Sequence, residues 1–295
     1  MNYYNEIKSK LIDNEIYSKV KDYSKERNRV LTYYEVGKLL SEAGSIYGED
    51  IIGKYSEKLI LEVGKKYNRR TLFRMKQFYI LFSNEKVSTM WTQLNWSHIR
   101  LLLKLDVNTI NYYIKSIINN KISVRELENK IKLKEYERLP VETKNKLKNE
   151  EKTSIKDLIP NPILIKNTNN YEDISEKVLQ RLILEDIPQF LEELGDGFCF
   201  IKNEYKVKMY DTYNYIDLLL YNIKYKSYVV IELKVTALKK EHIGQIQIYM
   251  NYIDRNIKGI DDNKTIGIII CKKDNKFVIE YCSDKRIISR TYELI

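Results

Sequence analysis

Charged residues inside two apolar, strand-like runs constrain this sequence most. The first run, Tyr215–Tyr221, contains Asp217, and the second, Tyr228–Lys234, contains Glu232 and ends on Lys234. Both runs are rich in β-branched and aromatic residues, and the segment between them is polar enough to turn. A charge within an apolar strand costs several kcal/mol unless it is paired or binds a metal ion. The two runs therefore predict a hairpin that carries a charged site.

The length of the turn predicts which charges meet. An antiparallel hairpin centred on Asn222–Lys226 places Asp217 opposite Glu232. Strand residues two apart share a face, so Lys234 points the same way as these two acids. A half-buried strand with its charges in water is the alternative. Apolar residues on both faces of each run favour covered strands, and so a cluster of two carboxylates and one ammonium.

Such a cluster suits phosphodiester hydrolysis. Asp217 and Glu232 offer hard oxygen ligands for Mg²⁺ or Mn²⁺, and the carbonyl of Leu233 could add a third. A divalent ion activates water and polarises a phosphoryl oxygen, and Lys234 could neutralise charge on the reacting phosphate. The chain has only two histidines, which excludes a multi-histidine metal site and disfavours Ser-His-Asp chemistry.

A predicted helix follows the second run. Residues 242–253 have helical spacing, and Gln245 and Tyr249 share one face of that helix. The alternative is an amphipathic helix with a polar edge. A strand at 228–235, this helix and an apolar strand at 265–271 form a β-α-β unit, which predicts parallel pairing and an α/β domain.

The whole chain divides into three parts. Residues 1–135 predict a helical domain, with helix starts at Asn68 and at the capping box that begins on Ser123. Residues 136–170 are rich in charge and predict a partly helical linker, and 171–295 predict the α/β domain. The further elements expected are helices at 35–40, 55–63, 72–82, 99–105, 110–118, 124–131 and 174–194, the last interrupted at Pro188, and strands at 198–201, 205–209 and 277–281.

The net charge of +10 is compatible with a polyanionic partner. The abundance of Lys, Asn, Ile and Tyr is also what an AT-rich coding sequence yields, so charge alone is weak support. Arg69, Arg70, Arg74 and Lys76 crowd the start of one predicted helix, where positive charge opposes the helix dipole. These four side chains are candidates for nucleic-acid contact, with a solvated face as the alternative.

Composition also indicates the compartment. The sequence has no run of about 18 apolar residues and no signal-peptide pattern at Met1–Glu6, so neither a membrane span nor a membrane partner is expected. Its three cysteines are scattered without metal-ligand spacing. A reduced, cytoplasmic protein is the expectation.

Asp217, Glu232-x-Lys234 and Gln245-x-x-x-Tyr249, in this order, resemble the PD-(D/E)XK nuclease superfamily in its RecB-like form. The chain is more closely similar to the DUF1016 or YhcG family of bacterial PD-(D/E)XK proteins. The resemblance covers nearly the whole chain. The matching segments are Phe190–Gly195, Gly197–Phe198, Tyr215–Leu219, Val229–Lys234, Gly244–Gln245 and Ile266–Cys271 in the second domain, and Arg69–Tyr79, Leu94–His98 and Ser123–Leu127 in the first.

This resemblance implies a restriction-endonuclease-like C-terminal domain after a mostly α-helical N-terminal domain. It implies that Asp217 and Glu232 hold Mg²⁺, that Lys234 is the catalytic lysine, and that Gln245 positions substrate or metal. Glu176 is the candidate for a glutamate on the first core helix. The family pattern favours a second acid four residues later, where this chain has Gln180.

The expected function is a metal-dependent nuclease, with double-stranded DNA as the first choice of partner. An RNA-directed nuclease and a non-catalytic nucleic-acid-binding or assembly module that kept the fold are the alternatives. Homo-oligomerisation, sequence preference and biological pathway stay open.

Overall fold

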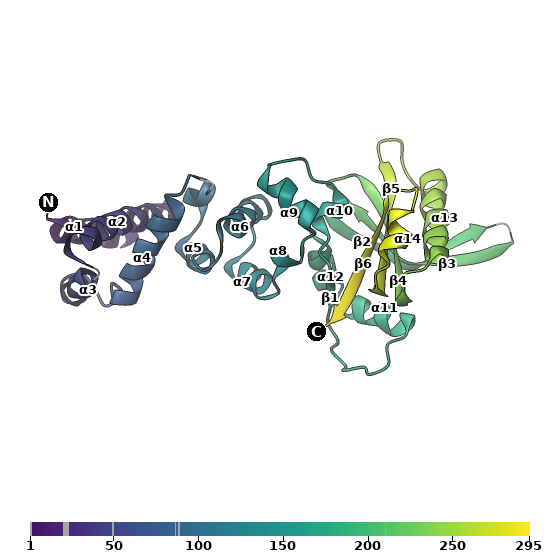
Figure 1. Cartoon of the computed structure of the whole chain (residues 1–295), viewed down its shortest axis with the longest axis horizontal. Coiled ribbons are helices and arrows are strands. Elements are labelled where there is room, and N and C mark those ends of the chain that lie inside the picture. The colour runs from purple at the N-terminus through teal and green to yellow at the C-terminus, as the bar shows by residue number, and fades with distance from the viewer. Residues whose placement is uncertain (1, 20–23, 49, 86, 88, 210) are drawn as a thin grey trace. The chain divides into compact units, whose positions relative to one another are not determined.

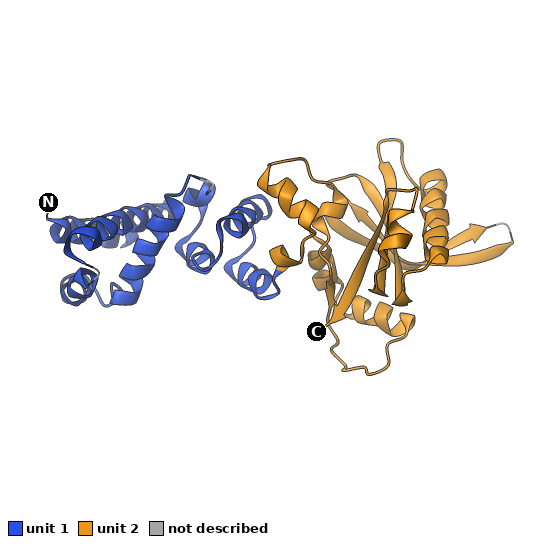
Figure 2. Cartoon of the chain, in the orientation of Figure 1, with its two compact units in different colours: residues 1–134 blue, residues 135–295 orange. Residues whose placement is uncertain are grey.

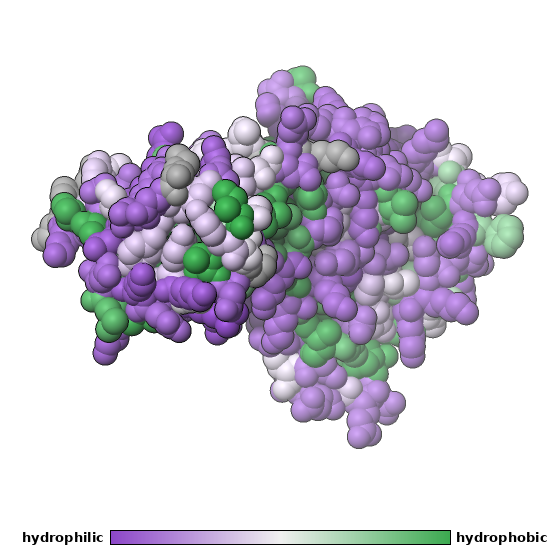
Figure 3. Space-filling model, turned by 60° about the vertical axis from the view of Figure 1, so that its left-hand side comes forward, coloured by the Kyte–Doolittle hydropathy of each residue, from purple (hydrophilic) through white to green (hydrophobic). Residues whose placement is uncertain are grey.

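The computed structural model describes residues 2–19, 24–48, 50–85, 87, 89–209 and 211–295. The chain forms two compact units, residues 1–134 and residues 135–295 (Figure 2). The face shown in Figure 3 is mostly hydrophilic, with apolar residues in small scattered groups. In the described part of the chain, no helix is both long and apolar enough to span a membrane.

Unit 1 is built from helices, as the sequence predicts (Figure 1). Asn68 caps one of them by accepting from the Thr71 backbone N–H, and Ser123 begins another with a complete capping box. Both helix starts were predicted, whereas the first helix and the first half of the second were not. The elements are α1 (Tyr3–Lys19), α2 (Lys25–Tyr47), α3 (Ile51–Glu62), α4 (Arg69–Phe82), the 3₁₀ helix η1 (Thr89–Gln93), α5 (Trp96–Leu102), α6 (Val107–Asn120) and α7 (Val124–Lys132).

A glycine allows α2 and α4 to pack closely. A Cβ atom at Gly37 of α2 would lie 2.1 Å from the carbonyl oxygen of Met75 on α4. Fully buried residues on both sides of this crossing, such as Val36 and Leu72, belong to one hydrophobic core. The core of unit 1 thus depends on close approach of two helix backbones.

Unit 2 is a six-stranded mixed sheet with helices on both faces (Figure 1). The strand order is β1-β6-β5-β4-β3-β2, in which β2, β3 and β4 form an antiparallel meander and the other neighbours pair in parallel. The elements are α8 (Glu135–Arg138), α9 (Val141–Lys148), α10 (Ile155–Leu158), β1 (Ile163–Ile165), α11 (Glu176–Glu185), α12 (Ile187–Leu194), β2 (Phe198–Met209), β3 (Thr212–Asn222), β4 (Ser227–Ala237), α13 (Lys240–Asn256), β5 (Asn263–Lys273), α14 (Lys276–Glu280) and β6 (Ile287–Leu294).

Two cores cover the sheet. Alternate residues of β4 divide between them: Val229 and Ile231 pack with α11 and α12, and Val230 packs with α13. The parallel β4-α13-β5 crossover has the predicted form. Gly267 of β5 lets α13 lie close to the sheet, since a Cβ there would be 2.6 Å from the sulfur of Met250.

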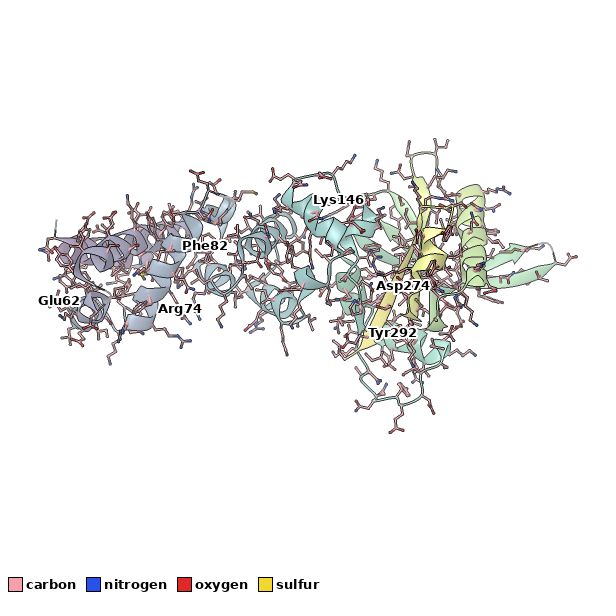
Figure 4. The ribbon with its side chains drawn as sticks, viewed as in Figure 1. Glu62, Arg74, Phe82, Lys146, Asp274 and Tyr292 are labelled. Atoms are coloured by element: carbon pink, nitrogen blue, oxygen red, sulfur yellow. The ribbon has the colours of Figure 1, made fainter. Side chains whose placement is uncertain are left out.

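Residues 136–170 are not the linker that their charge suggested. Ile155, Ile159 and Ile163 are buried in the core of unit 2, and β1 joins the sheet beside β6. Asp157, 4% exposed, accepts from the ammonium of Lys146 at 2.9 Å and from neighbouring hydroxyl and amide groups (Figure 4 labels Lys146 on α9). The apolar residues of this segment find their partners at the other end of the sequence, which composition does not reveal.

Other expectations for unit 2 need correction. The two strands expected at 198–201 and 205–209 are one strand, β2, whose pairing with β3 shifts by one residue between Phe200 and Lys202. Residues 277–281 are not a strand, because Asn275 caps the short helix α14 there. The C-terminal strand β6 was missed.

Candidate active site at the end of the β3–β4 ladder

The hairpin of β3 and β4 has the predicted register. Its ladder runs from Asn222↔Ser227 to Leu218↔Ile231. In the described part of the chain the main-chain pairing ends there. The next residue of β3, Asp217, accepts instead through its carboxylate Oδ2 from the backbone N–H of Leu233, at 2.7 Å. A side chain thus replaces a main-chain acceptor, which fixes the Asp217 carboxylate at the point where the two strands part.

Glu232 and Lys234 lie at the same point on β4. They are 2% and 8% exposed, and the Lys234 ammonium donates to Glu232 Oε1 at 2.9 Å. Lys234 also contacts Glu176 Oε2 at 3.2 Å. Glu232 Oε2 is buried and has no hydrogen-bond partner among the described residues. A buried carboxylate oxygen without a donor is costly, and a metal ion is one of the few ligands that would satisfy it.

The electrostatics of the three groups reflect this burial. Burial raises the pKa of Glu232 to about 7, and the nearby Asp217 carboxylate adds to the effect. Burial likewise raises the pKa of Asp217. Burial alone would lower the pKa of Lys234, but Glu232 and Glu176 more than offset it and the pKa is raised. Lys234 is therefore a cation at neutral pH.

The donor set fits a Mg²⁺-type ion. Among the residues that the structure describes, no group of three or more His, Cys, Asp and Glu side chains is arranged to bind a metal together. Mg²⁺ commonly takes only one or two carboxylates and completes its shell with water and substrate phosphate. Asp217 and Glu232, with the unpartnered oxygen of Glu232, match that requirement. The role expected for the Leu233 carbonyl stays a prediction.

Helix α11 brings two more groups to the site. Ser175 caps the helix, so Glu176 stands in its first turn and reaches Lys234. Gln180, one turn on, donates from its amide nitrogen to the backbone carbonyl of Asp217 at 3.0 Å. A carboxylate at this position could not donate that bond. The departure from the family pattern at Gln180 therefore has a structural reason.

Helix α13 supplies the pair that its spacing predicted. The Gln245 amide donates to the Tyr249 hydroxyl at 3.2 Å. Burial raises the pKa of Tyr249, and the nearby charges of Glu232 and Asp217 also raise it. Tyr249 thus keeps its proton and lies near the acids, while Gln245 orients its hydroxyl.

Sequence reasoning missed two neighbours of the site. Glu204 of β2 lies opposite Asp217, between the pairs Asn203↔Leu218 and Tyr205↔Ile216. His242 of α13 has its pKa lowered by burial and then by Lys234 and Lys239. Glu204 could have been found only by treating β2 as one strand.

The basic residues of α4 do not all behave as expected. Arg69 and Arg70 are exposed, and Arg74 (labelled in Figure 4) is half-buried. Burial lowers the pKa of Arg74, and Arg70 and Arg100 lower it further, so these guanidinium groups lie near one another. Lys76 is the exception: it is 9% exposed and its ammonium points at Gly44 of α2. Lys76 is therefore not placed to contact a nucleic acid.

Two family models together match most of the chain. One, described as the YhcG PDDEXK nuclease domain, matches residues 156–294, and the other, the DUF1016 N-terminal domain, matches residues 11–138. A protein of Escherichia coli (strain K12), "Putative nuclease YhcG", is 22% identical over an alignment of 283 residues, and the match covers 81% of this chain and 76% of that protein.

Solved structures also match part of the chain. A repair endonuclease from Pyrococcus abyssi is 18% identical with a TM-score of 0.30, and the match covers 42% of this chain and 49% of that one. An EndoMS–dsDNA2 complex is 19% identical with a TM-score of 0.31, covering 42% and 48%. The matches span about half the length of these solved chains.

Proposed function

Because the chain belongs to the DUF1016/YhcG family and carries a PD-(D/E)XK nuclease domain in unit 2, we propose that it is a metal-dependent nuclease that hydrolyses phosphodiester bonds of DNA. One observation carries the proposal. Glu232 Oε2 is buried without a hydrogen-bond partner among the described residues, and it lies beside a second carboxylate, Asp217, and a cation, Lys234. A merely structural ion pair would satisfy its oxygens, whereas a metal site leaves one free for the ion.

Asp217 and Glu232 would hold Mg²⁺ or Mn²⁺, and such an ion, when bound, polarises a phosphoryl oxygen and activates water for attack. Protein groups prepare the site for it. The Leu233 N–H and the Gln180 amide fix Asp217 from two sides, at 2.7 and 3.0 Å. The carboxylates are therefore oriented before substrate arrives, which lowers the reorganisation needed during the reaction.

Lys234 serves as a fixed positive charge. Its ammonium lies between Glu232 and Glu176, at 2.9 and 3.2 Å, and it stays protonated at neutral pH. A cation held in a largely buried position stabilises negative charge that develops on a phosphate more strongly than one in water. Tyr249 and Gln245 offer hydrogen-bonding groups on the α13 side of the same site.

A nucleic-acid substrate is supported by the net charge of +10 together with the guanidinium groups of Arg70, Arg74 and Arg100, which lie near one another. DNA is the first choice, and RNA is the alternative that the assay below distinguishes. Phosphate contacts from such residues supply affinity that does not depend on sequence. Arg69, exposed on the same helix, would extend this surface.

The test is a cleavage assay with the full-length protein. Circular and linear duplex DNA, single-stranded DNA and RNA are incubated with Mg²⁺, with Mn²⁺ or with EDTA. We expect DNA cleavage that requires the ion and falls at least about 100-fold in Asp217→Asn and in Lys234→Met. Glu172→Gln, an exposed acid on unit 2, is the matched control and should cleave as the wild type does.

Each other outcome has a definite meaning. Cleavage of RNA alone would reassign the substrate. Equal cleavage by Asp217→Asn and the wild type would refute the site. Binding without cleavage under every condition would favour a non-catalytic module.

A further inference from the structure

The hairpin of β2 and β3 continues beyond the sheet. Pairing of β3 with β4 ends at Leu218, whereas pairing of β2 with β3 continues from Lys202↔Leu219 to Met209↔Thr212. We call the residues Lys202–Met209 and Thr212–Asp217 the arm. It is a two-stranded ribbon that projects past α13 in Figure 1. Because one of its two strands is part of β3, the arm leads directly to Asp217.

The two faces of the arm differ. One face buries Val207 and Ile216 completely, in the same core as α13. The other face carries the cross-strand pairs Lys206↔Tyr215 and Lys208↔Tyr213. Tyr213 and Tyr215 are 50% and 51% exposed, and both lysines are exposed. One side of the arm is thus anchored, and the other offers two tyrosine rings between two cations.

The exposed face is organised. The Lys206 ammonium lies 3.6 Å from the centre of the Tyr213 ring, close enough for a cation–π interaction. This contact holds the ring and the charge together along the ribbon. Glu204 lies at the inner end, opposite Asp217, and Asp211 is exposed in the turn at the outer end. The cationic and aromatic part of the arm therefore lies between these two acids, from Lys206 to Lys208 on β2 and from Tyr213 to Tyr215 on β3.

The spacing points to one kind of ligand. Tyr213 and Tyr215 are two residues apart along β3, so their rings leave one side of the strand about 7 Å apart, and Asp217 follows two residues further along the same strand. Bases stacked in a duplex are about 3.4 Å apart and do not expose their faces to side chains. Rings about 7 Å apart suit successive bases of an unstacked, extended strand, with lysines at its phosphates.

We propose that the arm seats an unpaired stretch of nucleic-acid strand, stacking bases on Tyr213 and Tyr215 and pairing phosphates with Lys206 and Lys208, and that it guides the strand to Asp217. The inference rests on the proposed nuclease function and extends it to a substrate class: strands with a single-stranded region. A fully paired duplex would gain the lysine contacts but not the stacking.

The test is binding, measured separately from cleavage. Fluorescence anisotropy with the full-length protein in EDTA uses a labelled DNA strand of about 20 nucleotides, longer than the roughly 4–16 nucleotides of typical single-strand sites. The same strand annealed to its complement is the duplex probe. We expect the double variant Tyr213→Leu/Tyr215→Leu to lose at least about 10-fold in single-strand affinity. Its duplex affinity should change less than about twofold, because a duplex offers no free base faces.

Three further variants separate stacking from other causes. Tyr213→Phe/Tyr215→Phe keeps the rings and should keep the single-strand affinity. Lys206→Gln/Lys208→Gln should weaken the binding of both probes. For the single strand, the slope of log K against log salt concentration should become less steep by about 0.7 per lysine. Tyr281→Leu removes an exposed ring elsewhere on unit 2 and should change neither.

The outcomes are decisive. Wild-type single-strand affinity in the leucine variant, or an equal loss for both probes, would overturn the inference, as would a wild type that binds neither probe. Failure of the nuclease function looks different: the wild type would bind the single strand in a tyrosine-dependent way and yet cleave nothing. Cleavage that is unchanged in the leucine variant on single strands would overturn the arm's role and leave the nuclease intact.

Discussion

Replacing Glu232 with glutamine should stabilise the metal-free protein while it removes the proposed metal ligand. The pKa of Glu232 stands at about 7, against an ordinary value of 4.5, because the side chain is buried and lies near Asp217. An ionised Glu232 therefore costs the folded protein about 3 kcal/mol at pH 8. Lys234 keeps Glu176 and the amide oxygen as acceptors but loses a charged partner, which offsets part of the gain. We expect a net gain of about 1–2 kcal/mol, or about 2–8 °C in Tm.

The stabilisation expected for Glu232→Gln depends on pH. Below pH 4.5 the carboxyl group is protonated in the folded and the unfolded chain alike, so the cost is absent. The cost grows as the pH rises from 4.5 to about 7 and is complete above that. The gain in Glu232→Gln should therefore be large at pH 8 and small at pH 5.

The assay is thermal unfolding in EDTA at both pH values, followed by calorimetry and circular dichroism. Trp91 and Trp96, the two tryptophans of the chain, lie in unit 1, so their fluorescence reports unfolding of that unit separately. Glu172→Gln is the control and should not move the Tm at either pH. A lower Tm for Glu232→Gln at pH 8, or an equal gain at pH 5 and pH 8, would show that ionised Glu232 does not destabilise the folded protein.

Three further substitutions test the packing around the site and in unit 1. Gly37→Ala should destabilise unit 1 by about 1–3 kcal/mol, because the new Cβ would lie 2.1 Å from the Met75 carbonyl oxygen; an unchanged urea midpoint by tryptophan fluorescence would contradict this. Asp157→Asn should cost unit 2 about 2–3 kcal/mol. Burial alone would raise the pKa of Asp157, but the surrounding donors lower it. The contribution of Asp157 to the stability of unit 2 is therefore present above about pH 4 and is lost only in stronger acid. Unfolding curves that coincide with those of the wild type at pH 7 would contradict this structural role of Asp157. Gln180→Glu should cost about 1–3 kcal/mol, because it exchanges the donor to the Asp217 carbonyl for a second acceptor; a denaturation midpoint equal to that of the wild type would argue against this role of the amide.

The centre of the site was predictable because local rules determine it. Alternation along each run and the length of the turn set the β3–β4 register, which brings Asp217, Glu232 and Lys234 together. The spacing of Gln245 and Tyr249 likewise predicted that they share one face of a helix, where the structure shows a hydrogen bond between them. Sequence patterns of period two and of three to four residues carry this information directly.

What was missed depends on partners far away in the sequence. Ile155 and Ile159 lie among charged residues and are buried only because unit 2 closes around them. Lys76 belongs to a basic run, but α4 packs against α2, and the Lys76 ammonium lies buried beside Gly44. Glu204 lies opposite Asp217 only because β2 is one long strand. In each case the local sequence pattern was present, but contacts with residues far away in the sequence determined the burial or the pairing of these residues.

The proposed function depends on the binding of one divalent ion by the Glu232 oxygen that has no partner among the described residues and by the Asp217 carboxylate. Anomalous diffraction from crystals of the protein soaked in Mn²⁺ would test it most directly. We expect an anomalous peak within bonding distance of Glu232 Oε2 and an Asp217 carboxylate oxygen in the wild type, and the loss of this peak in Glu232→Gln. No peak at millimolar Mn²⁺, or a peak that touches neither carboxylate, would contradict it.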